Sequence, residues 1–175
     1  MARDTVDNLL SQWRAERPDL DVSALGIAIR VEMLAKLMRR GTTRNLARVG
    51  LKPWEYDVLS ALRRQGEPYQ LPARELALAS LLTAGAMTTR IDHLEHRQLV
   101  RREPDPDDRR GILVSLTKKG LALVDRAIEV RLKAAEADTC CLGRRERTGA
   151  EAALRQLLLS AEADDPEVGD ASRPD

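Results

Sequence analysis

Residues 83–120, TAGAMTTRIDHLEHRQLVRREPDPDDRRGILVSLTKKG, decide the expected fold because their hydrophobic pattern changes from helix to strand and back to helix. Apolar residues first recur at steps of three and four, which predicts a helix with one buried stripe. The stripe consists of Ala84, Met87, Ile91 and Leu94. The segment therefore opens with an amphipathic helix.

The other faces of this helix carry small and polar side chains near its start, namely Gly85, Ala86, Thr88 and Thr89. Thr83 is a suitable N-cap because its hydroxyl can accept a hydrogen bond from a free backbone amide. Small side chains let the start of a helix approach another surface closely. The major groove of DNA is such a surface, so this half of the helix is a candidate for DNA recognition.

A hairpin with a charged tip follows the helix. Residues 99–103 and 112–116 have strand-like sequences, and the eight residues between them include two prolines, three aspartates, two arginines and a glycine. Thr117 then caps a further helix. Lys118 and Lys119 in its first turn oppose the helix dipole, so a nearby phosphate backbone would explain them.

This order of elements resembles the winged helix-turn-helix of the MarR family of transcription regulators. The most specific part is the DRR sequence at 108–110 with the V-x-L-T-x-x-G sequence that ends at Gly120. The resemblance extends from about Val22 to Ala161. One departure is Gln98, where the family usually has a glycine before the first wing strand. The implied fold class is mainly α with a small β-wing: a winged helix-turn-helix with N- and C-terminal dimerisation helices.

The resemblance implies double-stranded DNA as a partner. Arg109 is expected to enter the minor groove, where arginine recognises narrow A·T tracts, and Asp108 is expected to orient it. Taken without the preceding helix, the same residues would indicate only a solvated polar hairpin. Lys119 is a further candidate for a phosphate contact. The full expected set is Thr83, Gly85, Ala86, Thr88, Thr89, Arg90, Asp108, Arg109, Arg110 and Lys118.

The rest of the chain has the pattern of a helical scaffold. Helices are predicted over about 5–17, 23–47, 53–65, 72–80, 117–137 and 143–161, with a short strand at 69–71. The chain has four aromatic residues and no phenylalanine, so its core must come mainly from aliphatic side chains. Residues 1–50 are assigned to N-terminal helices for dimerisation and a possible ligand site, 51–120 to the DNA-binding domain, 121–162 to C-terminal dimerisation helices and 163–175 to an acidic disordered tail.

Charge and targeting signals agree with this assignment. Residues 162–175 contain six acidic residues against one arginine, so the remaining chain is basic, at +6, although the whole carries only +1. No secretory signal or membrane-spanning run is present in the sequence, and a cytoplasmic location is expected. Apolar faces on the terminal helices favour a homodimer, which would place two recognition helices about 10 base pairs apart on a pseudo-palindromic site.

Four residues, of which Arg90 is also in the DNA-binding set, resemble the ligand set of the urate-responsive and PecS-like MarR proteins: Trp13, Asp57, Arg64 and Arg90. Two arginines suit a planar anion, an aspartate can accept from its N–H or O–H groups, and an indole offers a stacking face. Each residue alone has an ordinary explanation as packing or surface charge. Together they predict a small aromatic or carboxylate anion, with urate as one candidate, that releases a repressor from DNA; repression is what the resemblance implies.

Other functions were weighed against this one. Adjacent Cys140 and Cys141 would allow a redox-responsive MarR-type regulator. His93 and His96 lack the partners of a metal site, and neither a metal nor a cofactor is expected. No catalytic motif is present, so an enzyme is not expected. A helical interaction module that does not bind DNA is the remaining alternative.

Overall fold

The computed structural model describes residues 2–80, 82–106, 108 and 111–164. The chain forms two compact units, residues 1–44 and 45–175. Within the described residues, no helix has the length and apolar character needed to cross a membrane.

The N-terminal unit contains helix α1 (Thr5–Glu16) and most of helix α2 (Ser23–Arg48). Asp4 accepts from the backbone amide of Asp7 and the Asp7 side chain accepts from that of Asp4, which forms a capping box at the start of α1. A small cluster of Val6, Leu10 and Val22 joins the two helices. Both predicted helices are confirmed within one residue at each end.

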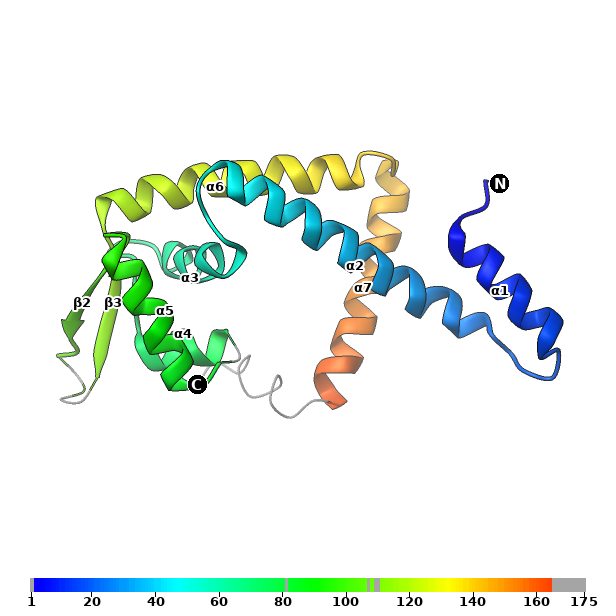
Figure 1. Cartoon of the computed structure of the whole chain (residues 1–175), viewed down its shortest axis with the longest axis horizontal. Coiled ribbons are helices and arrows are strands. Elements are labelled where there is room, and N and C mark those ends of the chain that lie inside the picture. Colours follow the sequence, from blue (N-terminus) through cyan, green and yellow to red (C-terminus); the bar gives the residue numbers. More distant parts are fainter. Residues whose placement is uncertain (1, 81, 107, 109–110, 165–175) are drawn as a thin grey trace. The chain divides into compact units, whose positions relative to one another are not determined.

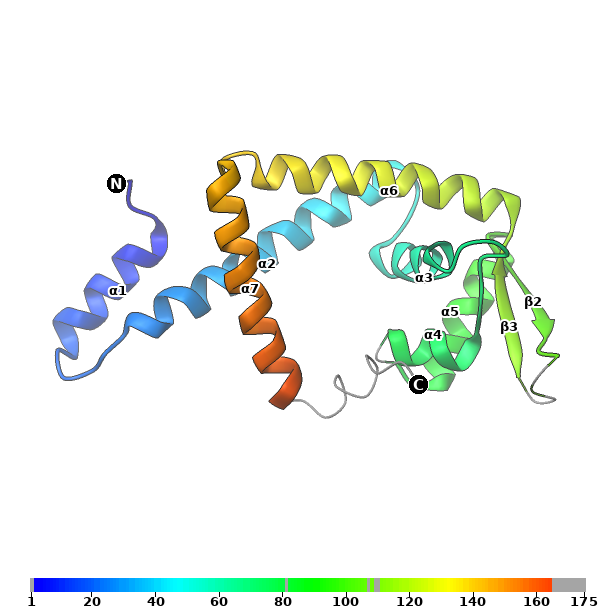
Figure 2. The same cartoon turned by 180° about the vertical axis from the view of Figure 1, so that it is seen from behind.

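The second unit contains the remaining elements, and Figures 1 and 2 show its strands β2 and β3 beside helix α5. In chain order these elements are α3 (Pro53–Arg64), β1 (Gln70–Pro72), α4 (Ala73–Ala79), α5 (Ala84–His96), β2 (Val100–Pro104), β3 (Ile112–Leu116), α6 (Lys118–Thr139) and α7 (Arg144–Asp164). Helices α4 and α5 form the helix-turn-helix, and β2 and β3 form the wing. The predicted fold class, mainly α with a small β-wing, is therefore confirmed.

The sheet has the strand order β1-β3-β2, and both pairs are antiparallel. Val114 in the central strand pairs with Leu71 on one side and Arg102 on the other. The short strand predicted at 69–71 is confirmed one residue later in the chain. By pairing with β3, it ties the segment before α4 to the wing.

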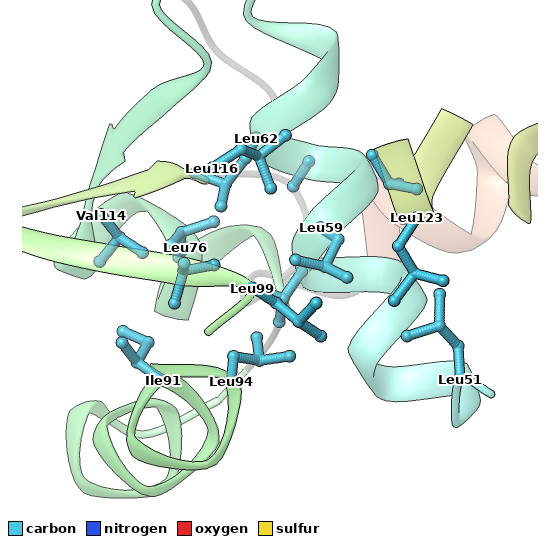
Figure 3. Packing of buried hydrophobic residues seen from close by; sticks show 14 of the residues in the cluster. Leu51, Leu59, Leu62, Leu76, Ile91, Leu94, Leu99, Val114, Leu116 and Leu123 are labelled. Atoms are coloured by element: carbon cyan, nitrogen blue, oxygen red, sulfur yellow. The ribbon is translucent and has the colours of Figure 1, made fainter. Parts of the chain in front are cut away.

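The core of this unit lies where α3, α4, α5 and the sheet meet (Figure 3). Leu59, Leu62 and Leu76 are fully buried there, as the helical spacing predicted. Met87, Ile91 and Leu94 bury the inner face of α5. Ala84 was expected in the same stripe but is exposed, because it lies in the first turn of α5, before the helix reaches the core.

The turn between α5 and the wing explains two sequence features. Gln98 has φ of 60°, the left-handed region in which glycine is easiest to accommodate, so the departure from the family's usual glycine occurs at a strained position. Thr117 donates from its hydroxyl to the Gln98 carbonyl (2.8 Å) and accepts from the Gly120 amide (3.0 Å). A Cβ on Gly120 would lie 1.9 Å from the Leu99 carbonyl oxygen. The T-x-x-G sequence thus allows α6 to begin directly against the wing.

The long terminal helices expose many large apolar side chains. On α2 and α7, side chains such as Leu34, Leu37, Leu154 and Leu158 are each more than half exposed. Helix α7 includes residues 163 and 164, which the sequence analysis placed in the acidic tail. The remainder of that tail, 165–175, lies outside the described residues.

Candidate nucleic-acid interface and effector pocket

The first half of α5 presents an exposed surface of small and hydroxyl side chains. Thr83 caps the helix and accepts from the Ala86 amide at 3.3 Å, as predicted. A Cβ added to Gly85 would meet no atom within 4 Å, so the helix start is open to a close approach. Gly85, Ala86, Thr88 and Thr89 are all exposed in the first half of α5, the helix that lies beside the wing in Figure 1.

The two threonine hydroxyls on this surface already donate hydrogen bonds within the helix. Thr88 donates to the Ala84 carbonyl at 2.9 Å, and Thr89 donates to the Gly85 carbonyl at 3.2 Å. Their oxygen lone pairs remain available, so in this arrangement they act as acceptors. They can accept from the amino groups of adenine or cytosine, whereas a bond to a phosphate requires the hydroxyl to rotate.

The wing tip is described only in part. The Gly111 amide donates to the Asp108 carbonyl at 2.8 Å, and the Asp105 amide donates to the Gly111 carbonyl at 3.1 Å, which closes the base of the loop. Arg109 and Arg110, predicted to contact DNA, lie outside the described residues. Their roles, and that of Asp108 in orienting Arg109, stay predictions.

An arginine of the wing, Arg102, holds β2 against helix α5. Its guanidinium donates to the Thr88 carbonyl at 3.3 Å and to the Asp92 carboxylate, and it lies 3.5 Å from a Glu95 carboxylate oxygen. The sequence analysis missed this contact because an arginine in a strand gives no sign of its partner. It fixes the wing and α5 as one surface.

The two lysines at the start of α6 differ in environment. Lys118 is exposed, as its expected contact with DNA requires. Lys119 donates from Nζ to the carbonyl of Arg97 at 2.9 Å, at the C-terminal end of α5. The dipole of α5 favours a cation at its C-terminal end. This explains why a lysine occurs at position 119, in the first turn of α6, where the dipole of α6 disfavours a positive charge. Lys119 therefore has a structural role that the sequence did not predict.

A pocket of about 340 Å³ brings together three of the four predicted effector residues. Asp57 and Arg64 extend from α3 and Arg90 from α5, and the full lining is Asp57, Ser60, Ala61, Arg64, Ala79, Ser80 and Arg90. The Arg64 guanidinium donates to Ser60 Oγ at 3.4 Å. The pocket thus combines two guanidinium groups, one carboxyl and two hydroxyls. The fourth residue, Trp13, belongs to the N-terminal unit, where it is 46% exposed.

Arg90 and Asp57 are held differently in this pocket. The Arg90 guanidinium stacks over the ring of Trp54, 5.4 Å from its centroid. Asp57 is exposed, but partial loss of hydration beside other protein atoms raises the pKa of its carboxyl, while the guanidinium groups of Arg90, Arg131 and Arg64 oppose this rise. Sequence analysis had missed Trp54 and Arg131 as neighbours of the site.

A buried carboxylate beside the pocket was also missed. Glu55 is only 1% exposed and accepts from His93 Nε2 at 2.9 Å and from the Arg97 guanidinium at 2.7 Å. Burial alone would raise the pKa of Glu55, but the Lys52 amide, Arg97 and His93 outweigh it and hold the pKa below its ordinary value. The only sequence signal was the glutamate three residues after the helix cap, which indicates capping but not these partners.

Proteins of known family are similar to this chain in sequence. The MarR family profile matches residues 49–111. The HTH-type transcriptional regulator PecS of Dickeya dadantii is 34% identical over 124 residues, covering 71% of this chain and 75% of PecS. The chain belongs to the MarR family. As a MarR family protein, it is a DNA-binding transcriptional regulator.

Two further proteins are similar to this chain, one in sequence and one in fold. The HTH-type transcriptional repressor NicR of Pseudomonas putida is 32% identical over 108 residues, covering 62% of this chain and 66% of NicR. The crystal structure of AbsC, a MarR family transcriptional regulator from Streptomyces coelicolor, superposes with a TM-score of 0.71 at 22% identity, covering 82% of this chain and 97% of AbsC. The AbsC likeness concerns the fold alone.

The cysteines and histidines are the remaining candidate groups of this MarR family chain. Cys140 and Cys141 are free and exposed after the end of α6. In the described part of the chain, no group of three or more His, Cys, Asp or Glu side chains is arranged to hold a metal ion. His93 is exposed, as expected of a surface histidine, and it also binds Glu55 and packs edge-on against Trp54 at 5.3 Å.

Proposed function

We propose that this regulator is a repressor that binds a pseudo-palindromic site as a homodimer and is released by a small aromatic or carboxylate anion. The observation that carries the proposal is the pocket in which Asp57, Arg64 and Arg90 meet. Arg90 belongs to both the pocket and the recognition helix α5. A ligand that binds there has a direct connection to the element that recognises DNA.

The chemistry of the pocket supports an anionic ligand with hydrogen-bond donors. Two guanidinium groups present planar sets of N–H donors that match a carboxylate or an enolate-like oxygen pair. Asp57 can accept from a ligand N–H or O–H group. A volume of about 340 Å³ suits one small ring system. Urate has these features and is one candidate.

Release of DNA would follow from the position of Arg90. The Arg90 guanidinium rests on the Trp54 ring. An anion that attracts Arg90 toward Arg64 changes how α5 is held, and ligand and DNA then favour different orientations of the helix. Linkage requires that such a ligand weakens DNA binding as much as DNA weakens ligand binding.

Homodimer formation is supported by the terminal helices. Leu154, Leu157 and Leu158 on α7 recur at steps of three and one and are each about half exposed. A contiguous apolar stripe of this kind on an isolated chain is typical of an interface. Repression is supported by the name of NicR, a transcriptional repressor. We also propose a cytoplasmic, non-catalytic protein, since its relatives are named as transcriptional regulators.

The test is DNA release by candidate ligands. A duplex site is selected from a random library with the wild-type protein, and its binding is titrated with urate and with a panel of aromatic and tricarboxylic acids. A ligand is expected to release the wild type at micromolar concentration but to be at least about tenfold less effective on Arg64→Ala, because one of two charged hydrogen-bonding groups is gone. Arg126→Ala, at an exposed position on α6, serves as the control and should respond like the wild type.

Three other outcomes would contradict parts of the proposal. If wild type and Arg64→Ala respond equally to every ligand, the pocket is not the sensor. If only peroxide releases DNA, and Cys140→Ser or Cys141→Ser prevents it, the exposed thiols are the sensor instead. If no duplex is bound with a steep salt dependence, the chain acts as a helical interaction module.

A further inference from the structure

One face of the recognition helix is attached to two consecutive residues of α3. Arg90, His93 and Arg97 follow one another at steps of three and four, so they lie on the same side of α5 and its C-cap. Arg90 and His93 both pack against the Trp54 ring. His93 and Arg97 both bind the Glu55 carboxylate.

The two oxygens of Glu55 have separate tasks. Oε2 accepts from the Lys52 amide at 2.7 Å and so caps α3. Oε1 accepts from His93 Nε2 at 2.9 Å and from Arg97 at 2.7 Å, and Arg97 also donates to the Gly50 carbonyl at 2.9 Å. One carboxylate therefore joins the start of α3 to the end of α5.

The hydrogen bonds of Glu55 restrict rotations of α5 that apolar packing alone would permit. Met87, Ile91 and Leu94 hold α5 against the core, but aliphatic contacts tolerate small rotations of a helix about its axis. Glu55 is 1% exposed, and a buried carboxylate that loses its donors is strongly disfavoured. Only helix rotations that keep both donors on Oε1 are therefore compatible with a stable fold.

We propose that Glu55 is a positioning residue for operator recognition, which sets the rotation of α5 through His93 and Arg97 without contacting DNA. This inference rests on α5 being the helix that enters the major groove. Contacts to base edges require defined placement of side chains, whereas contacts to phosphates are tolerant. Loss of the Glu55 attachment should therefore affect sequence-specific binding more than non-specific binding.

Glu55→Gln is the decisive variant, because a positioning role and a simple charge effect predict opposite changes in the affinity for DNA. A glutamine offers one acceptor oxygen, which cannot serve the Lys52 amide and Arg97 at once. The variant also removes a negative charge, which by electrostatics alone would strengthen DNA binding. We expect about tenfold weaker binding to the selected duplex, unchanged binding to a scrambled duplex and an unchanged salt dependence.

Asp125→Asn is the matched control. Asp125 accepts from Arg63 Nε at 2.7 Å and ties α6 to α3, so this variant removes the same charge and an ion pair of similar geometry without involving α5. We expect it to bind the selected duplex as the wild type does, or slightly more tightly. His93→Leu keeps the Lys52 cap and should lose about threefold in specific binding. Binding is measured well below each variant's unfolding temperature, which circular dichroism provides.

The results can overturn the inference in two ways. If folded Glu55→Gln binds the selected duplex as tightly as Asp125→Asn does, Glu55 does not position α5. If Glu55→Gln weakens binding to the selected and scrambled duplexes equally, the effect is not one of sequence recognition. A wild-type protein that binds no duplex would instead refute the proposed function itself.

Discussion

At the scale of single residues, Gly120 shows how one missing side chain sets the position of a helix. A Cβ at this position would lie 1.9 Å from the Leu99 carbonyl oxygen, and that oxygen belongs to backbone that cannot swing away. We expect Gly120→Ala to lower the free energy of unfolding by about 3 kcal/mol or more, because α6 must shift from the wing. Urea denaturation followed by circular dichroism measures this.

The same substitution in open space is the control for that prediction. Gly149 lies inside α7, and a Cβ added there would meet no atom within 4 Å. Alanine is the better helix former, so Gly149→Ala should stabilise the protein by about 0.5–1 kcal/mol. If Gly120→Ala were as stable as Gly149→Ala, the close approach of α6 to Leu99 would not exist in solution.

At the scale of elements, the junction of α3 and α5 should give stability a defined pH dependence. The pKa of Glu55 is lower in the folded state than its ordinary value of 4.5. Its ionised form therefore stabilises the fold above that value, and this contribution is lost as pH falls through the lower folded pKa. We expect the stability gap between wild type and Glu55→Gln to shrink as pH falls below about 4.5. A gap that stays constant down to pH 3 would contradict the observed hydrogen bonds.

At the scale of the whole molecule, the exposed leucines of α7 predict the assembly state. Leu157 and Leu158 are 48% and 59% exposed. We expect the double variant Leu157→Glu, Leu158→Glu to sediment as a monomer, because carboxylates without a positive partner are strongly disfavoured in an apolar interface. It should also bind the selected duplex at least about a hundredfold more weakly, since each monomer contacts one half-site.

Gln156→Glu adds charge to the same helix at an exposed polar position. It should remain a dimer in sedimentation and keep its affinity for the selected duplex. A double leucine variant that still sediments as a dimer would show that the apolar stripe of α7 is not the interface.

The order and type of the elements follow from local features of the sequence. Helical spacing, the caps Thr83 and Thr117 and the charged hairpin are local features, and local features decide local conformation. The spacing of Asp57 and Arg64 on one helix also placed these two side chains together.

Which distant side chains meet depends on tertiary packing. Glu55 reaches Arg97, 42 positions later, and Lys119 reaches the Arg97 carbonyl, 22 positions earlier. No local pattern contains such pairs, because they arise when separate elements pack on a shared core. The stacking of Arg90 on Trp54 has the same origin, and so does the exposure of Ala84. Periodicity shows which face of a helix turns inward, whereas packing selects the partner of each charged group on that face.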